Sequence, residues 1–398
     1  GGWYPEDETG NSGFLVDIFY DKSMKKIRFA YAHITNIEKN ERRIVKAADF
    51  LILGVKKLVP SRRVDVTEFL TEGGIKLASE AGGLVSSSDL MTRMAHFYDK
   101  YFYLDEKTPF WFSAAYALFT WVHDSFDLLT FLRARGGSGS GKSDLMYLIG
   151  ITSYRFAAIS ASSTDASFRG LARDYKATIL IDEVQEAMRK DDGSLAAFLK
   201  GRFSTRFSRH TQMEERTDAE GKKIYTVSMA NVYGPTLFTM YGSFKDDGIE
   251  NRCMSFDLSQ VDMFTLDKHD IEPGYYPSEI EEEAQEIRNM CLHWRLATWL
   301  PKLELSHEQR KKYRLSDPLV SPRINSTLRP IKVLAVLQGD MQLLENLKKI
   351  GQANYQDEIT KRASSFEAII LRSLLAADIA QDLKDGVQPM ASPAYAEK

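Results

Sequence analysis

One glycine-rich stretch decides the expected fold of this chain, and it reads Gly136-Gly137-Ser138-Gly139-Ser140-Gly141-Lys142-Ser143. It matches G-x-x-x-x-G-K-[ST], the pattern of loops whose backbone N–H groups turn towards phosphate oxygens. A largely apolar run at 128–133 precedes it, and a helical pattern of apolar residues follows it. Because a phosphate-binding loop sits between a strand and a helix, we prefer this interpretation to a flexible Gly/Ser linker.

The residues at the end of this loop have separate chemical roles. Lys142 would place a cation on the β- and γ-phosphates of ATP, and the Ser143 hydroxyl would coordinate Mg²⁺. Asp144 lies in the first turn of the following helix, whose N-terminal dipole favours phosphate. We therefore expect residues 136–144 to bind the cofactors, ATP and Mg²⁺.

An acidic pair forms the second motif. An almost fully apolar strand at 177–181 ends in Asp182-Glu183, 40 residues after Lys142. Asp182 would hold the Mg²⁺ shell, and Glu183 would orient and polarise the attacking water. A solvated acidic turn is the alternative, but the glycine loop at this spacing favours a hydrolytic Walker B strand.

Two arginines are candidates for completing the site. Arg252 comes just before the last predicted strand, where it can reach a nucleotide on a neighbouring subunit and act in catalysis. Arg323 lies in the helical C-terminal part and could bind the nucleotide as a second sensor, a role for which Arg329 competes. The alternatives are a surface arginine capping a helix end and a solvated basic side chain.

Alternation of short strands and helices predicts the architecture. About five buried strands separated by helices favour an α/β fold with a parallel sheet flanked by helices. We expect a small α+β region at 1–85, with a hairpin formed by 14–20 and 26–32. The ATPase core would span 86–265, and a helical lid region 266–398. The strands of the sheet are expected at 128–133, 155–160, 177–181, 235–241 and 253–258.

Composition narrows the functional classes. The chain has 398 residues with a net charge of −3, so any nucleic-acid site must be a local basic patch. Its two cysteines are too few for a disulfide framework or a zinc cluster and suit the cytoplasm. The apolar run at 110–119 is shorter than the span of about 20 residues that crosses a membrane. We expect a cytoplasmic protein without a membrane partner.

One local patch is basic. Between 200 and 211 the sequence has Lys200, Arg202, Arg206, Arg209 and His210 and no acid, and a predicted hairpin at 206–232 carries Lys222 and Lys223 near its turn. Basic side chains on a projecting element can contact phosphates. We expect Arg206, Arg209, Lys222 and Lys223 to contact DNA. A solvated face is the alternative, because four acids lie nearby: Glu214, Glu215, Asp218 and Glu220.

Together these residues resemble the AAA+ ATPase modules of phage and plasmid replication proteins, which are associated with primases and related to superfamily III helicases and minichromosome-maintenance proteins. The resemblance covers residues 103–337. Its motifs are Trp121-Val122-His123-Asp124-Ser125-Phe126-Asp127 before the glycine loop, the Asp182-Glu183 strand, Val232-Tyr233-Gly234-Pro235-Thr236, Glu250-Asn251-Arg252, and Arg323 ahead of Arg329-Pro330-Ile331.

The resemblance implies a P-loop fold and a homo-oligomeric ring, usually a hexamer, with nucleotide between subunits. It also implies a hairpin that lines the pore, single-stranded DNA as partner and a primase as partner or fused domain. The main expectation is thus Mg-dependent ATP hydrolysis by a motor that translocates on DNA or unwinds it, a replicative helicase of a mobile element. One departure is that the fourth strand ends without the family's sensor asparagine, for which Thr239 is the best substitute.

Three other functions stay open from the sequence. An AAA+ remodeller or regulatory switch that acts on protein would hydrolyse ATP without responding to DNA. A nucleotide-binding scaffold would need no water-activating carboxylate, so Glu183 argues against it. A small-molecule kinase is disfavoured by the Asp182-Glu183 pair and the trailing helical region.

Overall fold

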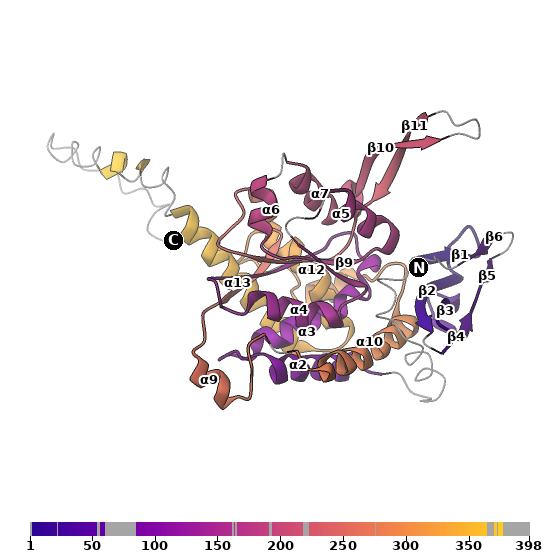
Figure 1. The fold of residues 1–398 in the computed structure, drawn as a ribbon, viewed down its shortest axis with the longest axis horizontal. Helices are drawn as coiled ribbons and strands as arrows, with labels where there is room; N and C mark the ends of the chain where they lie inside the picture. The colour runs from indigo at the N-terminus through magenta and orange to yellow at the C-terminus, as the bar shows by residue number, and fades with distance from the viewer. Residues whose placement is uncertain are drawn as a thin grey trace.

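A five-stranded parallel sheet forms the centre of the molecule (Figure 1). The computed structural model describes residues 2–21, 23–53, 56–59, 85–160, 163, 165–190, 193–217, 223–274, 276–363, 370–371 and 373–376. The strand order is β13-β7-β12-β9-β8, and every neighbouring pair is parallel. The prediction of an α/β fold with such a sheet is therefore confirmed. The strands are β7 (Phe131–Gly136), β8 (Phe156–Ile159), β9 (Thr178–Ile181), β12 (Thr236–Met240) and β13 (Cys253–Leu258).

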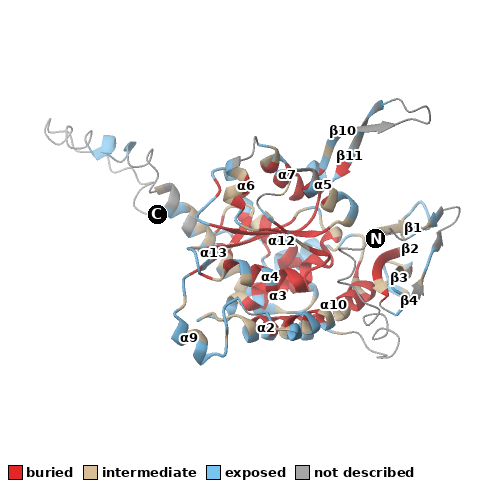
Figure 2. Ribbon diagram, viewed as in Figure 1, coloured by how far each residue is buried: buried red, intermediate tan, exposed pale blue. Residues whose placement is uncertain are grey.

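Helices cover both faces of the sheet, and the sheet between them is buried (Figure 2). Successive side chains of a strand point to opposite faces. Leu180 accordingly belongs to one hydrophobic cluster, while Ile179 and Ile181 belong to the other. The first cluster includes α2 (Ser87–Tyr101), α3 (Thr108–Thr120), α4 (Lys142–Thr152) and α10 (Ser278–Thr298). The second includes α5 (Asp165–Gly170), α6 (Val184–Lys190) and α7 (Ser194–Arg202).

The position of β7 differs from the sequence prediction. The strand begins at Phe131 rather than at 128, and it includes two arginines, Arg133 and Arg135. Central strands of parallel sheets are usually apolar throughout. Here the arginines are tolerated because each pairs with a carboxylate, Arg133 with Glu250 and Arg135 with Asp257.

The N-terminal region is a second, antiparallel sheet in the order β1-β2-β3-β4. Its strands are β1 (Gly2–Pro5), β2 (Gly13–Asp21), β3 (Lys26–Asn36) and β4 (Glu41–Ala48), followed by the short pair β5 (Leu51–Leu53) and β6 (Lys56–Leu58). The predicted hairpin is confirmed as β2–β3. Any helix of the expected α+β region lies outside the described residues, since 60–84 are not described.

A buried carboxylate joins this sheet to the core. Asp17 of β2 is fully buried and lies 2.5 Å from the Arg155 guanidinium and 3.1 Å from that of Arg295. The Tyr154 hydroxyl donates to the same carboxylate at 2.8 Å. Arg295 also pairs with Asp124, so one charge network connects β2, the start of β8 and α10.

The C-terminal part is helical, as predicted. After α8 (Asp247–Glu250) and α9 (Met263–Lys268), α10 is followed by α11 (His307–Lys312), α12 (Pro322–Leu337) and α13 (Met341–Ala363). Between α7 and β12 the antiparallel hairpin of β10 (Arg209–Thr217) and β11 (Lys223–Asn231) projects from the body (Figure 1). Among the described helices, none combines the length and the apolar character that a membrane span requires.

Candidate active site

The glycine loop and the acidic pair meet at one edge of the sheet. The glycine loop leaves the carboxyl end of β7, and Asp182-Glu183 follow the carboxyl end of β9. Strand β12 lies between these two strands and pairs with both. Because carboxyl ends of parallel strands share an edge, residues far apart in the sequence converge there, where open α/β sheets bind ligands.

Local geometry explains why two positions of the loop are occupied by glycine. Gly141 caps α4 with φ of 74°, a left-handed conformation that glycine adopts without strain. A Cβ at this position would also lie 2.7 Å from the Phe102 ring. At Gly136 a Cβ would lie 2.3 Å from the Leu258 carbonyl oxygen, so the strand end has no room for a side chain. The first-turn N–H groups of α4 have no partner within the helix and point out of its N-terminus.

Lys142 folds back across this loop. Its Nζ donates to the Gly137 carbonyl oxygen at 2.6 Å and lies 4.8 Å from the centroid of the Tyr241 ring. The Ser140 hydroxyl donates to the same carbonyl at 2.9 Å. The ammonium group is therefore held between Gly137 and Tyr241, next to the loop that would bind a phosphate group.

Three polar side chains converge next to the loop. The Ser143 hydroxyl donates to Asp182 Oδ1 at 2.7 Å, and the Thr239 hydroxyl donates to the same oxygen at 2.5 Å. One hydroxyl and one carboxylate form a partial ligand set. Mg²⁺ commonly has one or two carboxylates and completes its shell with water and substrate phosphates. The residues present thus fit a Mg²⁺ ion bound together with a nucleotide.

Glu183 adopts an uncommon backbone conformation. Its φ is 49°, in the left-handed region that residues with a side chain rarely occupy. The Glu183 N–H donates to Thr239 Oγ1 at 2.8 Å, and its carbonyl accepts from Glu186 N at 2.8 Å. Thr239 therefore holds both members of the acidic pair, and the Glu183 residue that follows Asp182 is exposed.

Loss of the Thr239 hydroxyl should impair this arrangement. If the protein hydrolyses ATP, we expect Thr239→Val to lower activity by about 10- to 100-fold and to raise the Mg²⁺ requirement, as for other residues that orient a metal ligand. Thr239→Ser should retain activity, because it keeps the hydroxyl. The measurement is the rate of phosphate release against Mg²⁺ concentration. Equal rates for Thr239→Val and the wild type would contradict the assignment.

A large cavity continues from the loop. It has a volume of about 1390 Å³ and is lined by Gly139, Ser140 and Gly141, by residues 99–103 and by residues from the segments 260–274 and 276–277, the first of which carries α9. Two of the lining residues, Tyr103 and His269, contact each other, with their ring centroids 4.6 Å apart. Its position beside the glycine loop suits the nucleoside part of a nucleotide, and its volume is more than large enough to hold one. Sequence reasoning missed these residues because residues 99–103 and the later segments are distant in sequence and none of them has a motif.

Asp144 lies at this cavity, but its carboxylate accepts a hydrogen bond from the Tyr276 hydroxyl. The contact connects the segment 276–277 to the first turn of α4. Burial, together with this carboxylate, raises the pKa of Tyr276, so the phenol stays a donor. Asp144 thus contacts Tyr276, in the segment that lines the cavity.

The two arginine candidates lie near the amino ends of the strands, opposite the glycine loop. The Arg252 carbonyl accepts from Phe131 N at 2.9 Å, at the start of β7, whereas the glycine loop follows the end of that strand. The Arg252 guanidinium lies 4.3 Å from the Phe203 ring. Arg323 donates to the Gly248 carbonyl at 3.1 Å, and its charge adds to burial in lowering the pKa of Arg252. The structure brings these arginines together but not to the glycine loop of the same chain.

The basic patch separates into structural and exposed members. Arg202 is fully buried and donates to the carbonyls of Val232, Ala177 and Pro235, and burial lowers its pKa to about 9. Lys200 pairs with Asp246 at 2.6 Å. Four residues were expected to contact DNA, of which Arg206, Arg209 and Lys223 are exposed and Lys222 lies outside the described residues.

The hairpin also has an apolar surface. Tyr225, Val227 and Met229 alternate along β11 and share one face. Their exposed fractions are 61%, 66% and 66%, high values for such side chains. A projecting element of this kind suits contact with a partner, by base stacking or by apolar packing.

Two of the motifs quoted for the family resemblance have packing roles. The Tyr233 hydroxyl donates to the carbonyls of Phe126 and His123, which joins the segment before β7 to the segment before β12. A Cβ on Gly234 would lie 2.9 Å from Arg202 Nη2. These residues position strands and do not enter the candidate site.

No protein-family model and no curated protein matches the chain. The functional assignment therefore depends on the geometry of the residues described above.

Proposed function

We propose that this protein is a Mg-dependent ATPase with a P-loop fold of the AAA+ type. The observation that carries the proposal is the convergence of Lys142, Ser143 and Asp182 at the carboxyl edge of β7 and β9, beside a cavity that can hold a nucleoside. A glycine loop that only linked two elements would need neither the Ser143–Asp182 contact nor the capping of α4 by a left-handed glycine.

Each residue of the site has a role in this proposal. The N-terminus of α4 and Lys142 bind the β- and γ-phosphates, so that negative charge is neutralised where it develops. Ser143 and Asp182 hold Mg²⁺, which supplies electrostatic stabilisation of the phosphates. Glu183 orients a water molecule and accepts its proton, and Thr239 keeps Asp182 and Glu183 in position.

Arg252 fits a role in the site of a neighbouring subunit. An arginine supplied in trans can stabilise the charge of the transition state. Since Arg252 lies at the sheet edge opposite its own glycine loop, it can act only on a nucleotide bound by another copy. A homo-oligomeric ring, a hexamer by family resemblance, provides that arrangement, and Arg323 beside it would belong to the same interface.

The proposed substrate of the motor is single-stranded DNA. The projecting hairpin supports this, because Arg206, Arg209 and Lys223 are exposed on it or at its base. Exposed Tyr225 could stack on a base, as aromatic side chains do in proteins that bind single strands. By resemblance, a primase is the proposed partner or fused domain, and a replicative helicase the proposed role.

The direct test is the ATPase rate with and without single-stranded DNA, together with the mass of the assembly in the presence of nucleotide. We expect a multimer whose ATPase is stimulated by DNA. Alanine at Arg206, Arg209, Lys222 and Lys223 should remove the stimulation and reduce the salt dependence of DNA binding. Lys302→Ala, an exposed lysine on another part of the surface, is the control and should change neither.

The apolar face of the hairpin favours a second candidate, an AAA+ remodeller or switch that acts on protein. Tyr225, Val227 and Met229 are better suited to apolar packing than to phosphate contacts. In that case ATPase would be insensitive to DNA, and the four alanine substitutions would have no effect. No ATPase activity under any condition would exclude both candidates.

A further inference from the structure

The segment between β12 and β13 runs from the carboxyl ends of the strands back to their amino ends. It begins at Tyr241, whose ring lies 4.8 Å from Lys142 Nζ, and it ends at Arg252, whose carbonyl bonds to the start of β7. Only one short helix, α8, lies between them. The position of Arg252 therefore depends on what holds this short segment to the sheet.

A buried ion pair holds it. Arg133 of β7 is 2% exposed and donates through both terminal nitrogens to the two carboxylate oxygens of Glu250, the last residue of α8. Glu250 Oε2 also accepts from Phe244 N at 2.9 Å. One carboxylate thus joins the loop after β12 and the end of α8 to the strand that leads into the glycine loop. Bidentate arginine–carboxylate pairs are directional, which fixes orientation as well as distance.

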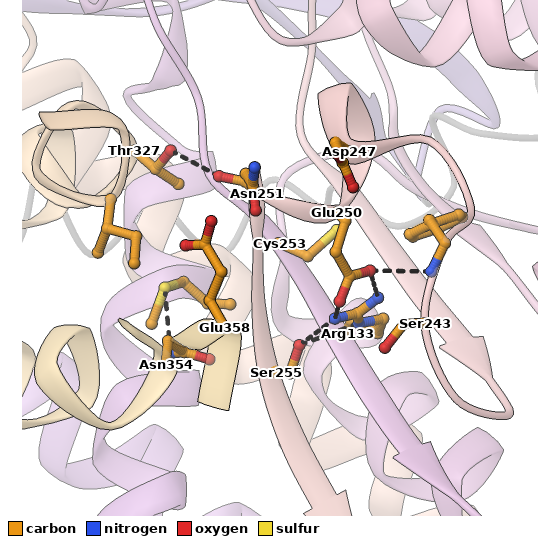
Figure 3. A pocket seen from close by; sticks show the side chains of 13 residues that line it. Arg133, Ser243, Asp247, Glu250, Asn251, Cys253, Ser255, Thr327, Asn354 and Glu358 are labelled. Carbon is orange, nitrogen blue, oxygen red and sulfur yellow. Dashed lines mark hydrogen bonds and ion pairs between the residues drawn. The ribbon is translucent and has the colours of Figure 1, made fainter. Parts of the chain in front are cut away.

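Packing around this ion pair is incomplete. A cavity of about 170 Å³ separates α8 and β13 from α12 and α13, and Figure 3 shows the Arg133–Glu250 contact at its wall with Asn251 and Thr327 across from it. The Thr327 hydroxyl reaches the Asn251 carbonyl only at 3.4 Å. The ion pair is thus a directional contact that orients α8, in addition to the buried Ile249 side chain and the Lys200–Asp246 pair.

We propose that Arg133 and Glu250 are positioning residues that place Arg252 for the nucleotide site of the neighbouring subunit. The proposal rests on the proposed function, in which Arg252 acts in trans. Arg133 and Glu250 touch no nucleotide themselves. They connect the strand of one ATP site to the arginine offered to the next.

The test uses a double apolar replacement, Arg133→Met with Glu250→Leu, in the full-length chain. Replacing both members of a buried pair usually preserves folding, whereas removing one leaves a buried charge. We expect binding of ATP by the variant to be unchanged. The kcat should fall about 100-fold, the effect of a displacement of about 1 Å in a catalytic group. Glu250→Gln, which keeps the shape and loses the charge, should show a smaller loss of kcat.

The matched control is Arg135→Met with Asp257→Leu. Arg135 lies on β7 like Arg133 and nearer to the glycine loop, but it pairs with Asp257 of β13 and not with Glu250 of α8. We expect this control to keep the wild-type kcat. An equal loss in the control would mean that any charge lost from β7 impairs the glycine loop, and would overturn the proposal.

A mixing experiment separates a positioning role in trans from damage to the chain's own site. Subunits with Lys142→Ala have a defective loop but an intact Arg252. Mixed with the Arg133→Met/Glu250→Leu subunits, they supply Arg252 to intact loops, so activity should return. Mixtures of the Arg133→Met/Glu250→Leu subunits with Arg252→Ala subunits should stay inactive, because neither kind of subunit supplies a correctly placed Arg252. No recovery with Lys142→Ala subunits would overturn the proposal.

The failures of the two proposals are distinguishable. An inactive wild type would exclude the proposed function and this inference with it. An active wild type in which Arg252→Ala has no effect would exclude the trans arginine and this inference with it, but would leave the proposed ATPase activity standing. If the double variant and Glu250→Gln both failed to fold, as judged by thermal unfolding and by lost ATP binding, the pair would be structural and the inference wrong.

Discussion

Replacing Glu183 with glutamine is expected to lower the kcat for ATP hydrolysis about 10³-fold while ATP still binds, which is the usual size of a general-base contribution. The amide keeps the shape of the side chain but cannot accept the proton of the attacking water. Lys142 and the Ser143–Asp182 contact remain in place, so the phosphates still have their partners. The measurements are single-turnover hydrolysis and the affinity for a fluorescent ATP analogue.

Glu186→Gln is the matched control for Glu183→Gln. Glu186 lies on the next turn, in α6, and its carboxylate pairs with Arg189. We expect its kcat to match that of the wild type. If Glu183→Gln kept full activity, the water-activating role would belong to another residue and the proposed mechanism would be wrong.

Replacing Asp17 with alanine is expected to reduce the free energy of unfolding by about 4 kcal/mol, the cost of leaving a buried ion pair with one member. Arg155 and Arg295 are fully buried and would lose a shared partner. Since Asp17 belongs to the N-terminal sheet, the variant should also loosen that sheet from the core. Thermal unfolding and amide hydrogen exchange of β2 measure the two effects.

Asp49→Ala is the control for Asp17→Ala, because Asp49 pairs with Lys26 and Arg28 while its side chain is 51% exposed. An exposed pair contributes only about 0–1 kcal/mol. Burial alone would raise the pKa of Asp17, but Arg155 and Arg295 outweigh it and hold the pKa below the ordinary value of 3.8. The stabilisation is thus complete above the unfolded pKa and lost as pH falls through the folded one. Equal stability of Asp17→Ala and the wild type at neutral pH would contradict the role of the network.

Short-range patterns predicted much of the site. The glycine loop is contiguous, and its glycines, lysine and serine each have a local reason that needs no other part of the chain. The Asp182-Glu183 pair follows an apolar strand, so its place at the edge of a parallel sheet could be expected from the strand alone. The predicted strand at 128–133 was misplaced because an apolar pattern cannot foresee that Arg133 and Arg135 would be neutralised by partners more than a hundred residues away.

The glycine loop itself could therefore be predicted from the sequence, whereas its surroundings could not. The sequence alone determined that the stretch 136–143 leads from a strand through a turn into a helix, because glycine conformations and helix capping are local properties. Tertiary structure decided what surrounds that turn. Thr239, the cavity walls and the Arg133–Glu250 pair reach their places only when distant strands and helices pack together, and no pattern within one segment records those contacts.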